Sequence, residues 1–136
     1  MFRHGAMILA ALAVLALSAC ATTPGGDDRR VVERAEARWD AIVTDKLEEA
    51  YEYYSPGYRS STSLINFGTE MRLRKVRYIS AEYLDHQCEQ SRCTVRFTVG
   101  YRVFAPVPGM RQFDGKQVVE DTWVKTSGEW WYLPNK

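Results

Sequence analysis

The stretch that decides the fold is RWDAIVTDKLEEAYEYYSPGYR, residues Arg38–Arg59. Its apolar residues recur at helical spacing up to Val43 and again from Leu47, and Thr44-Asp45 interrupts the pattern. Ser55-Pro56-Gly57 ends the second run, because the residue before a proline avoids the helical region and glycine is permissive. The stretch therefore predicts two helices joined by a break, followed by a tyrosine-rich exit.

The helices can be extended in both directions from this stretch. The first is expected from about Asp28 to Val43, with an apolar face made of Val32, Ala35, Trp39, Ile42 and Val43. Asp45 lies three residues before Glu48, which resembles a capping box, so the second helix is expected to start at Lys46. Its apolar face consists of Leu47, Ala50, Tyr51 and Tyr54. We expect Tyr58–Thr62 to be extended and a third helix to cover Ser63–Leu73, capped by Ser61 or Thr62.

From Arg74 onward the apolar period changes to two. Over Arg92–Ala105 apolar residues alternate regularly with polar or small ones, which predicts a strand with one buried face. That face consists of Cys93, Val95, Phe97, Val99, Tyr101 and Val103. Further strands are expected over Lys75–Leu84, Gln117–Lys125 and Glu129–Leu133, with a loop from Pro106 to Asp114. The first of these alternates imperfectly, which indicates a bulge. Short connections between consecutive strands predict an antiparallel sheet, and helices followed by such a sheet predict an α+β fold.

The N-terminal residues have the pattern of an export signal. Arg3 and His4 precede the apolar run Ala6–Leu17, which is too short for a membrane-spanning helix. Leu17-Ser18-Ala19-Cys20 resembles the lipobox of bacterial lipoproteins. The resemblance implies a signal peptide over residues 1–19, lipidation of Cys20, and attachment of the protein to the cell envelope through that lipid. The alternative is an ordinary signal peptide with a chance cysteine.

The residues after the cysteine bear on location and on domain organisation. Ala21 is not the aspartate that favours retention in the inner membrane of enteric-type bacteria, which implies the periplasmic face of the outer membrane. Residues 20–28 contain Pro24, Gly25 and Gly26 and predict a flexible tether. Residues 29–136 are then long enough for a single domain with its own core.

Charge excludes one class of partner. Residues 1–19 carry one charged side chain, Arg3, so the chain from Cys20 onward has 17 basic and 17 acidic side chains. This balance argues against nucleic-acid binding, which needs clustered excess basic residues. The only local excess is Arg72, Arg74, Lys75 and Arg77, which could meet acidic lipid head groups or an acidic partner, or could be a solvated junction.

Three local patterns resemble the NTF2-like (SnoaL-like) superfamily. They are the Trp39…Leu47…Ala50-Tyr51 spacing, the Tyr54-Ser55-Pro56-Gly57-Tyr58-Arg59 exit, and the hairpin Asp121-Thr122-Trp123…Gly128-Glu129-Trp130-Trp131. The order of elements is also similar to that of its small lipid-anchored members. The resemblance covers about residues 30–134 and implies a cone in which a curved antiparallel sheet of about four long strands wraps the N-terminal helices.

Cys88 and Cys93 flank a short turn between two predicted strands. In an exported protein such a pair predicts a disulfide, and facing positions of a hairpin come close to bonding range. A zinc site formed with His86 lacks a fourth ligand and has wide cysteine spacing. A redox pair would more often have a Cys-x-x-Cys spacing.

The candidate catalytic residues are Asp121, Tyr54 and Asp40. Asp121 shares a strand face with Val119 and Trp123, so an inward orientation would put an acid among aromatic rings. Enzymes of the NTF2-like superfamily, such as ketosteroid isomerase, use an acid with a tyrosine in the cone. Asp121 could instead pair with Arg96 or Arg102, or face water. The candidate pocket residues are Trp39, Tyr51, Tyr54, Tyr58 and Trp123.

These features favour a non-enzymatic binding or interaction module without cofactor or metal. Its cone would hold an apolar or aromatic small molecule, or its sheet would dock an envelope protein or form a homodimer. The alternative is an enzyme of the isomerase or dehydratase type that uses Asp121 with a pocket tyrosine.

Overall fold

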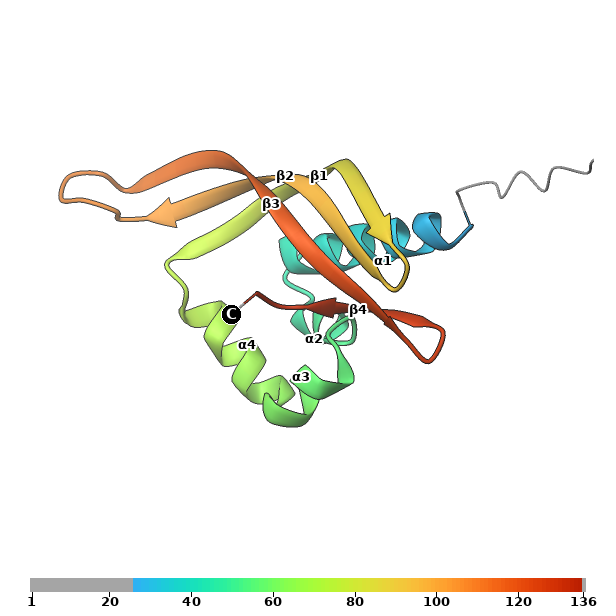
Figure 1. The fold of residues 1–136 in the computed structure, drawn as a ribbon. Coiled ribbons are helices and arrows are strands. Elements are labelled where there is room, and N and C mark those ends of the chain that lie inside the picture. Colours follow the sequence, from blue (N-terminus) through green and yellow to red (C-terminus); the bar gives the residue numbers. More distant parts are fainter. Residues whose placement is uncertain (1–25, 136) are drawn as a thin grey trace, which may run out of the picture.

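The computed structural model describes residues 26–135 and has the predicted α+β architecture (Figure 1). Four helices lie on one side of a curved antiparallel sheet with strand order β1-β2-β3-β4. The helices are α1 (Gly26–Val43), α2 (Leu47–Tyr51), α3 (Pro56–Ser61) and α4 (Leu64–Leu73), and the strands are β1 (Val76–Glu89), β2 (Arg92–Phe104), β3 (Gln112–Thr126) and β4 (Glu129–Leu133).

Part of the predicted organisation lies outside the described residues. This applies to the signal peptide, to Cys20 and to the tether up to residue 25. Across residues 26–135, none of the helices has both the length and the apolarity needed to cross a membrane.

Helix α1 begins at Gly26, two residues before the expected start. Asp27 explains the earlier start, because its carboxylate accepts hydrogen bonds from Lys125 Nζ at 2.8 Å and from Trp130 Nε1 at 3.2 Å. An acid in the first turn also suits the positive end of the helix dipole. The start of α1 is therefore fastened to the β3–β4 hairpin.

The buried face of α1 differs from the predicted one. It consists of Val31, Ala35, Arg38, Trp39, Ala41 and Ile42, whereas Val32 and Val43 are only half-buried. The prediction missed Arg38 because charged residues were assigned to the solvent side. Arg38 follows Ala35 by three residues and Val31 by seven, which places it on the same face.

The prediction that Asp45 caps the second helix is wrong. Asp45 has a φ of +59°, and α2 has no side-chain cap at its N-terminus. The amide of Lys46 instead bonds to the carbonyl of Ala41 at 2.8 Å, and the amide of Asp45 bonds to the carbonyl of Ile42 at 3.2 Å. This is the Schellman pattern, so Asp45 is the left-handed residue that ends α1.

Helix α3 replaces the predicted extended segment Tyr58–Thr62. The Ser55 hydroxyl accepts a hydrogen bond from the amide of Tyr58, and Pro56 occupies the first helical position, where its missing amide proton costs nothing. Pro56 thus starts a helix and does not end one, since α2 ends at Tyr51. Helix α4 is capped by Ser63, whose side chain accepts from the amide of Asn66, and not by Ser61 or Thr62.

The sheet contains the predicted strands but extends two of them. Strand β1 continues to Glu89, and the expected bulge is present twice, near Ile79 and near Leu84. Strand β3 begins at Gln112, so most of the predicted loop is part of a β2–β3 hairpin that reaches beyond the helices (Figure 1). Gly115 pairs with Tyr101, and a Cβ at Gly115 would come within 2.6 Å of the tyrosine side chain. Here glycine marks a close approach and not a loop.

Strand β4 closes the cone against the chain that follows α2. Tyr54 forms an isolated parallel bridge with Tyr132. The amide of Ser55 donates to the Tyr132 carbonyl at 2.9 Å, and the amide of Tyr132 donates to the Tyr53 carbonyl at 2.7 Å. The tyrosine-rich exit is therefore held beside the last strand, and α2 ends at Tyr51, earlier than its predicted apolar face implied.

Candidate functional site

The cone encloses a cavity of about 220 Å³ between α1, α4 and the inner face of the sheet. We refer to it as the inner cavity. Its aromatic lining consists of Trp39, Tyr54, Tyr58, Phe67, Tyr78 and Tyr132. Its charged lining consists of Arg38, Glu70, Arg74 and Asp121.

A buried ion pair lies at the inner end of this lining. Arg38 on α1 is 4% exposed and Asp121 on β3 is 1% exposed. Arg38 Nη1 donates to Asp121 Oδ2 at 3.1 Å, and Trp39 Nε1 donates to the same oxygen at 2.9 Å. Asp121 therefore points inward, as the strand pattern allowed, and α1 supplies both donors that hold it.

Aromatic rings surround the guanidinium of Arg38. Its Cζ lies 3.5 Å from the centroid of the Tyr132 ring and 5.1 Å from that of the Tyr54 ring. Its Nη2 donates to the Tyr54 hydroxyl at 3.0 Å. Burial lowers the pKa of Arg38, but the neighbouring Tyr54 and Asp121 outweigh it, so the pKa is raised and the side chain stays charged.

Two polar atoms of this pair have no hydrogen-bond partner within residues 26–135. They are Arg38 Nε and Asp121 Oδ1. Burial raises the pKa of the Asp121 carboxyl, while the Arg38 charge and the Trp39 donor act in the opposite direction. A buried acceptor without a partner costs about 1–3 kcal/mol. Trp123 Nε1 is also buried without a partner in the described residues, and its N–H lowers the pKa of Asp121, so the two unpartnered groups lie near each other in the core.

The arginine that pairs with Asp121 is not one of the two named from the sequence. Arg96 forms a bidentate pair with Asp85, and Arg102 forms one with Asp114 at 2.8 Å for both contacts. Those pairs lie at the surface, where each guanidinium is paired with a carboxylate on the neighbouring strand. The prediction that Asp121 would pair with Arg96 or Arg102 is therefore wrong.

Some predicted pocket residues line the inner cavity and others do not. Trp39, Tyr54 and Tyr58 line it. Tyr51 packs on Phe67 and donates its hydroxyl proton to the Thr62 carbonyl at 2.8 Å, so it joins α2 to the segment after α3. Trp123 is fully buried in the core.

Asp40, the second candidate acid, is exposed and lies away from Asp121, beside a separate surface hollow with Glu36. The residues missed by the sequence analysis are Arg38, Tyr78 and Tyr132. Helical register could have found Arg38, whereas the bridge that brings Tyr132 to Tyr54 depends on tertiary structure.

A second hollow of about 400 Å³ borders the inner cavity. We refer to it as the outer hollow. Both are lined by Ile42, Met71, Arg74 and Tyr78, so they meet at these residues. Arg72 and Arg77 line the outer hollow together with Arg74. None of these three arginines has a carboxylate within ion-pair distance in the described part of the chain.

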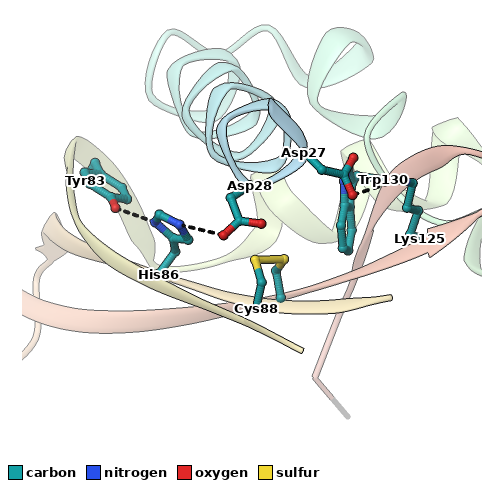
Figure 2. Close-up of a disulfide and its surroundings, with 8 residues drawn as sticks. Asp27, Asp28, Tyr83, His86, Cys88, Lys125 and Trp130 are labelled. Atoms are coloured by element: carbon teal, nitrogen blue, oxygen red, sulfur yellow. Dashed lines mark hydrogen bonds and ion pairs between the residues drawn. A yellow bond between two sulfur atoms is a disulfide. The ribbon is translucent and has the colours of Figure 1, made fainter. Parts of the chain in front are cut away.

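The predicted disulfide between Cys88 and Cys93 is confirmed. The two cysteines face each other in the β1–β2 register, with their Cα atoms 4.1 Å apart. The bond closes the hairpin beside the start of α1 (Figure 2).

No family model matches the sequence, and no curated protein matches it. Solved structures do match the fold. An NTF2-like family protein from Streptomyces avermitilis, named as a candidate dehydratase, has a TM-score of 0.55 at 10% identity, over 78% of this chain and 90% of that one. A SEC-C motif containing protein from Rhodopseudomonas palustris has a TM-score of 0.54 at 17% identity, over 74% and 73% of the two chains.

A SEC-C motif containing protein from Psychrobacter arcticus is similar as well. Its TM-score is 0.54 at 13% identity, and the match covers 83% of this chain and 63% of that one. At these identities the likenesses concern the fold alone. Together with the helices packed inside the curved antiparallel sheet, they define an NTF2-like cone.

Proposed function

We propose that this chain is a non-enzymatic, lipid-anchored binding module that holds a small aromatic molecule with an anionic group in its cone. The observation that carries the proposal is the inner cavity, which combines an aromatic wall with the buried pair of Arg38 and Asp121 and adjoins a hollow lined by arginines. Ligand sites are typically apolar hollows with a few convergent polar groups.

The cavity limits the size of the ligand. Sites for drug-sized molecules have volumes of about 300–1,000 Å³. The inner cavity has about 220 Å³, so we expect a compound with a single ring or a short apolar body. The tyrosines among its walls offer ring faces and edges for offset or edge-to-face packing, and Tyr78 lies on the side shared with the outer hollow.

The arginines of the outer hollow are the reason for proposing that the ligand carries an anionic group. Arg74 lies where the inner cavity meets the outer hollow, Arg72 and Arg77 line the outer hollow alone, and no ion pair within residues 26–135 neutralises these three arginines. Guanidinium groups bind carboxylates and phosphates through two parallel hydrogen bonds. A ligand with its ring in the inner cavity and its anionic group beside these arginines would pack on the aromatic wall and pair with the guanidinium groups.

The geometry gives the enzyme alternative less support. A general base needs a carboxylate that is free to take a proton from the substrate. Asp121 Oδ2 already accepts from Arg38 and Trp39, which fix the position of the carboxylate, although burial raises its pKa. The second candidate acid, Asp40, does not line the cavity. The pair is better suited to orienting a bound molecule than to moving a proton.

A matched pair of variants on strand β3 tests the binding site. Val119 lines the inner cavity, whereas Val118 lies on the outer face of the same strand and is 55% exposed. Val119→Phe should fill the cavity, and Val118→Phe makes the same chemical change outside it. We expect phenylacetate to raise the melting temperature of the wild type and of Val118→Phe but not of Val119→Phe, and benzyl alcohol to have a smaller effect.

Two results would count against the binding site. One is that no aromatic compound in a panel of carboxylates and neutral analogues shifts the melting temperature. The other is that Val119→Phe responds as strongly as Val118→Phe. If neutral analogues raise the melting temperature as strongly as phenylacetate, the ligand needs no anionic group, but the inner cavity remains its binding site.

The membrane anchor has its own test. The proposal places the lipid on Cys20 and the protein at the periplasmic face of the outer membrane. Mass spectrometry of the N-terminal peptide from the membrane fraction should give Cys20 as the first residue, carrying a diacylglyceryl group. An unmodified Cys20, or a mature chain that starts elsewhere, contradicts the lipid anchor. The proposal of a binding site in the inner cavity does not depend on this result. Docking of an envelope protein on the sheet, or of a second copy, stays a prediction.

A further inference from the structure

The disulfide lies in a cluster of metal-ligating groups that the binding site does not use (Figure 2). Asp28 on α1 and His86 on β1 face each other, with 3.5 Å between Asp28 Oδ2 and His86 Nε2. One ligand atom each of Asp28, His86 and Cys88 lies within 4.8 Å of the other two. In Figure 2 the Cys88 sulfur points toward α1, on the same side of the sheet as His86.

The orientation of His86 is set by a fourth side chain. The Tyr83 hydroxyl lies 2.6 Å from His86 Nδ1, within hydrogen-bond distance. This contact leaves Nε2 as the nitrogen that faces Asp28 (Figure 2). Metal-ligating histidines are commonly held in this way, with a hydrogen bond at one ring nitrogen and the metal at the other.

We propose that reduction of the disulfide converts this corner into a zinc site with Asp28, His86, Cys88 and Cys93 as ligands. Zinc prefers four ligands of the thiolate, imidazole and carboxylate classes in a tetrahedron. Bond lengths of about 2.0–2.3 Å place neighbouring ligand atoms about 3.3–3.8 Å apart. The 3.5 Å between Asp28 Oδ2 and His86 Nε2 already matches this spacing.

The cysteines supply the remaining two ligands once the bond between them is broken. They face each other across the β1–β2 hairpin with 4.1 Å between their Cα atoms, so both sulfurs stay at the same corner. In the oxidised protein neither sulfur is a thiolate, and only Asp28 and His86 can bind. The redox state of the pair therefore decides whether the corner is a cross-link or a metal site.

The conversion needs a two-electron reductant, such as a dithiol. Its thiolate attacks Cys88 Sγ, because Cys88 is half-buried while Cys93 is fully buried, and Cys93 leaves as a thiolate. The second thiol of the reductant then attacks the reductant's first sulfur, which is bonded to Cys88 in the mixed disulfide, and Cys88 leaves as a thiolate. The reductant becomes a disulfide, two electrons pass to the cysteines, and zinc takes the place of the protons that the two thiols would carry.

The test uses the full chain with Cys20→Ser in detergent, so that Cys88 and Cys93 are its only thiols. Zinc is titrated against a competing chelating dye before and after reduction with a phosphine, with near-ultraviolet circular dichroism recorded on each sample. We expect one zinc ion per reduced chain and none per oxidised chain. Cobalt should give the thiolate charge-transfer and tetrahedral ligand-field bands in the reduced protein only.

Three variants identify the ligands. Asp28→Asn and His86→Asn should each weaken zinc binding by at least about tenfold. Glu89→Gln removes an exposed acid at the end of the same strand and should leave the affinity unchanged. The proposal is overturned if the reduced chain binds no zinc, if the oxidised chain binds it equally well, or if Asp28→Asn and His86→Asn behave like Glu89→Gln. A reduced chain that unfolds and is not refolded by zinc also overturns it.

Discussion

The buried pair of Arg38 and Asp121 provides the sharpest test of the core of the cone. Asp121→Leu would leave a guanidinium that is 4% exposed without its counter-charge, and would also remove the acceptor of the Trp39 N–H. Removing one partner of a buried pair costs about 3–5 kcal/mol, because the other charge stays desolvated and unpaired. We expect Asp121→Leu to lower the free energy of unfolding by this amount.

The double variant Arg38→Met/Asp121→Leu should be much closer to the wild type. It replaces both charges by apolar groups, and such replacements of a buried pair are often close to neutral. We expect it to lose about 1–3 kcal/mol, because the buried Trp39 N–H loses its acceptor and Met cannot stack on Tyr132 as the guanidinium does at 3.5 Å. The difference from the sum of the two single variants measures the coupling within the pair.

Urea unfolding followed by tryptophan fluorescence is the assay, with the slope checked for each variant. Asp114→Asn is the matched control, since it breaks a bidentate arginine pair at the surface and should cost no more than about 1 kcal/mol. The reasoning is refuted if Asp121→Leu costs no more than Asp114→Asn. It is also refuted if the double variant loses as much as the two single variants together.

Three smaller predictions concern stability. Asp45→Gly should stabilise by up to about 1 kcal/mol in thermal unfolding, because Asp45 has a φ of +59°; a loss would favour the N-cap role. Ser55→Ala should cost about 1 kcal/mol through its lost N-cap, whereas Ser60→Ala, within α3, should cost less; equal losses would contradict this assignment. Burial raises the pKa of Tyr132 from 10.0 to about 12, so the unfolded state loses its proton first and stability falls as pH rises across that window. The fall should reach at most about 2–3 kcal/mol by urea unfolding and should shrink in Tyr132→Phe; an unchanged fall contradicts it.

Where local signals agreed, the sequence was enough to predict the fold. The alternation over Arg92–Ala105 has a single physical explanation, a strand with one buried face, and β2 follows it nearly to the end. The cysteines face each other because the strands on both sides of a short turn must pair. The α+β class follows from the order of these elements.

The errors arose where one residue type has two local uses. A proline such as Pro56 can stop a helix or occupy its first position, and an aspartate before a helix can be its N-cap or the left-handed end of the preceding helix. Gly109 lies in a turn with a φ of +86°, while Gly115 allows a close approach within a strand. Residue type alone cannot separate these uses: for Asp45 and Pro56 the deciding hydrogen bonds are local, from Lys46 to Ala41 and from Tyr58 to Ser55, and depend on the backbone conformation.

The candidate site was predictable only in part. Asp121 and Tyr54 could be proposed from strand and helix faces, but their partner Arg38 could not be chosen by residue type, since charged residues on helices are mostly exposed. Arg38 is buried because Asp121, 83 residues later in the chain, supplies the counter-charge and Tyr132 supplies a ring.

The central claim, that the inner cavity holds a small aromatic anion, is tested most directly by mass spectrometry of the natively extracted protein. Wild type, Val118→Phe and Val119→Phe are purified side by side, and the small molecules released on denaturation are compared. We predict that one aromatic anion recurs with the wild type and with Val118→Phe and is depleted in Val119→Phe. The absence of any recurring species, or the same species at the same level in Val119→Phe, would contradict the account.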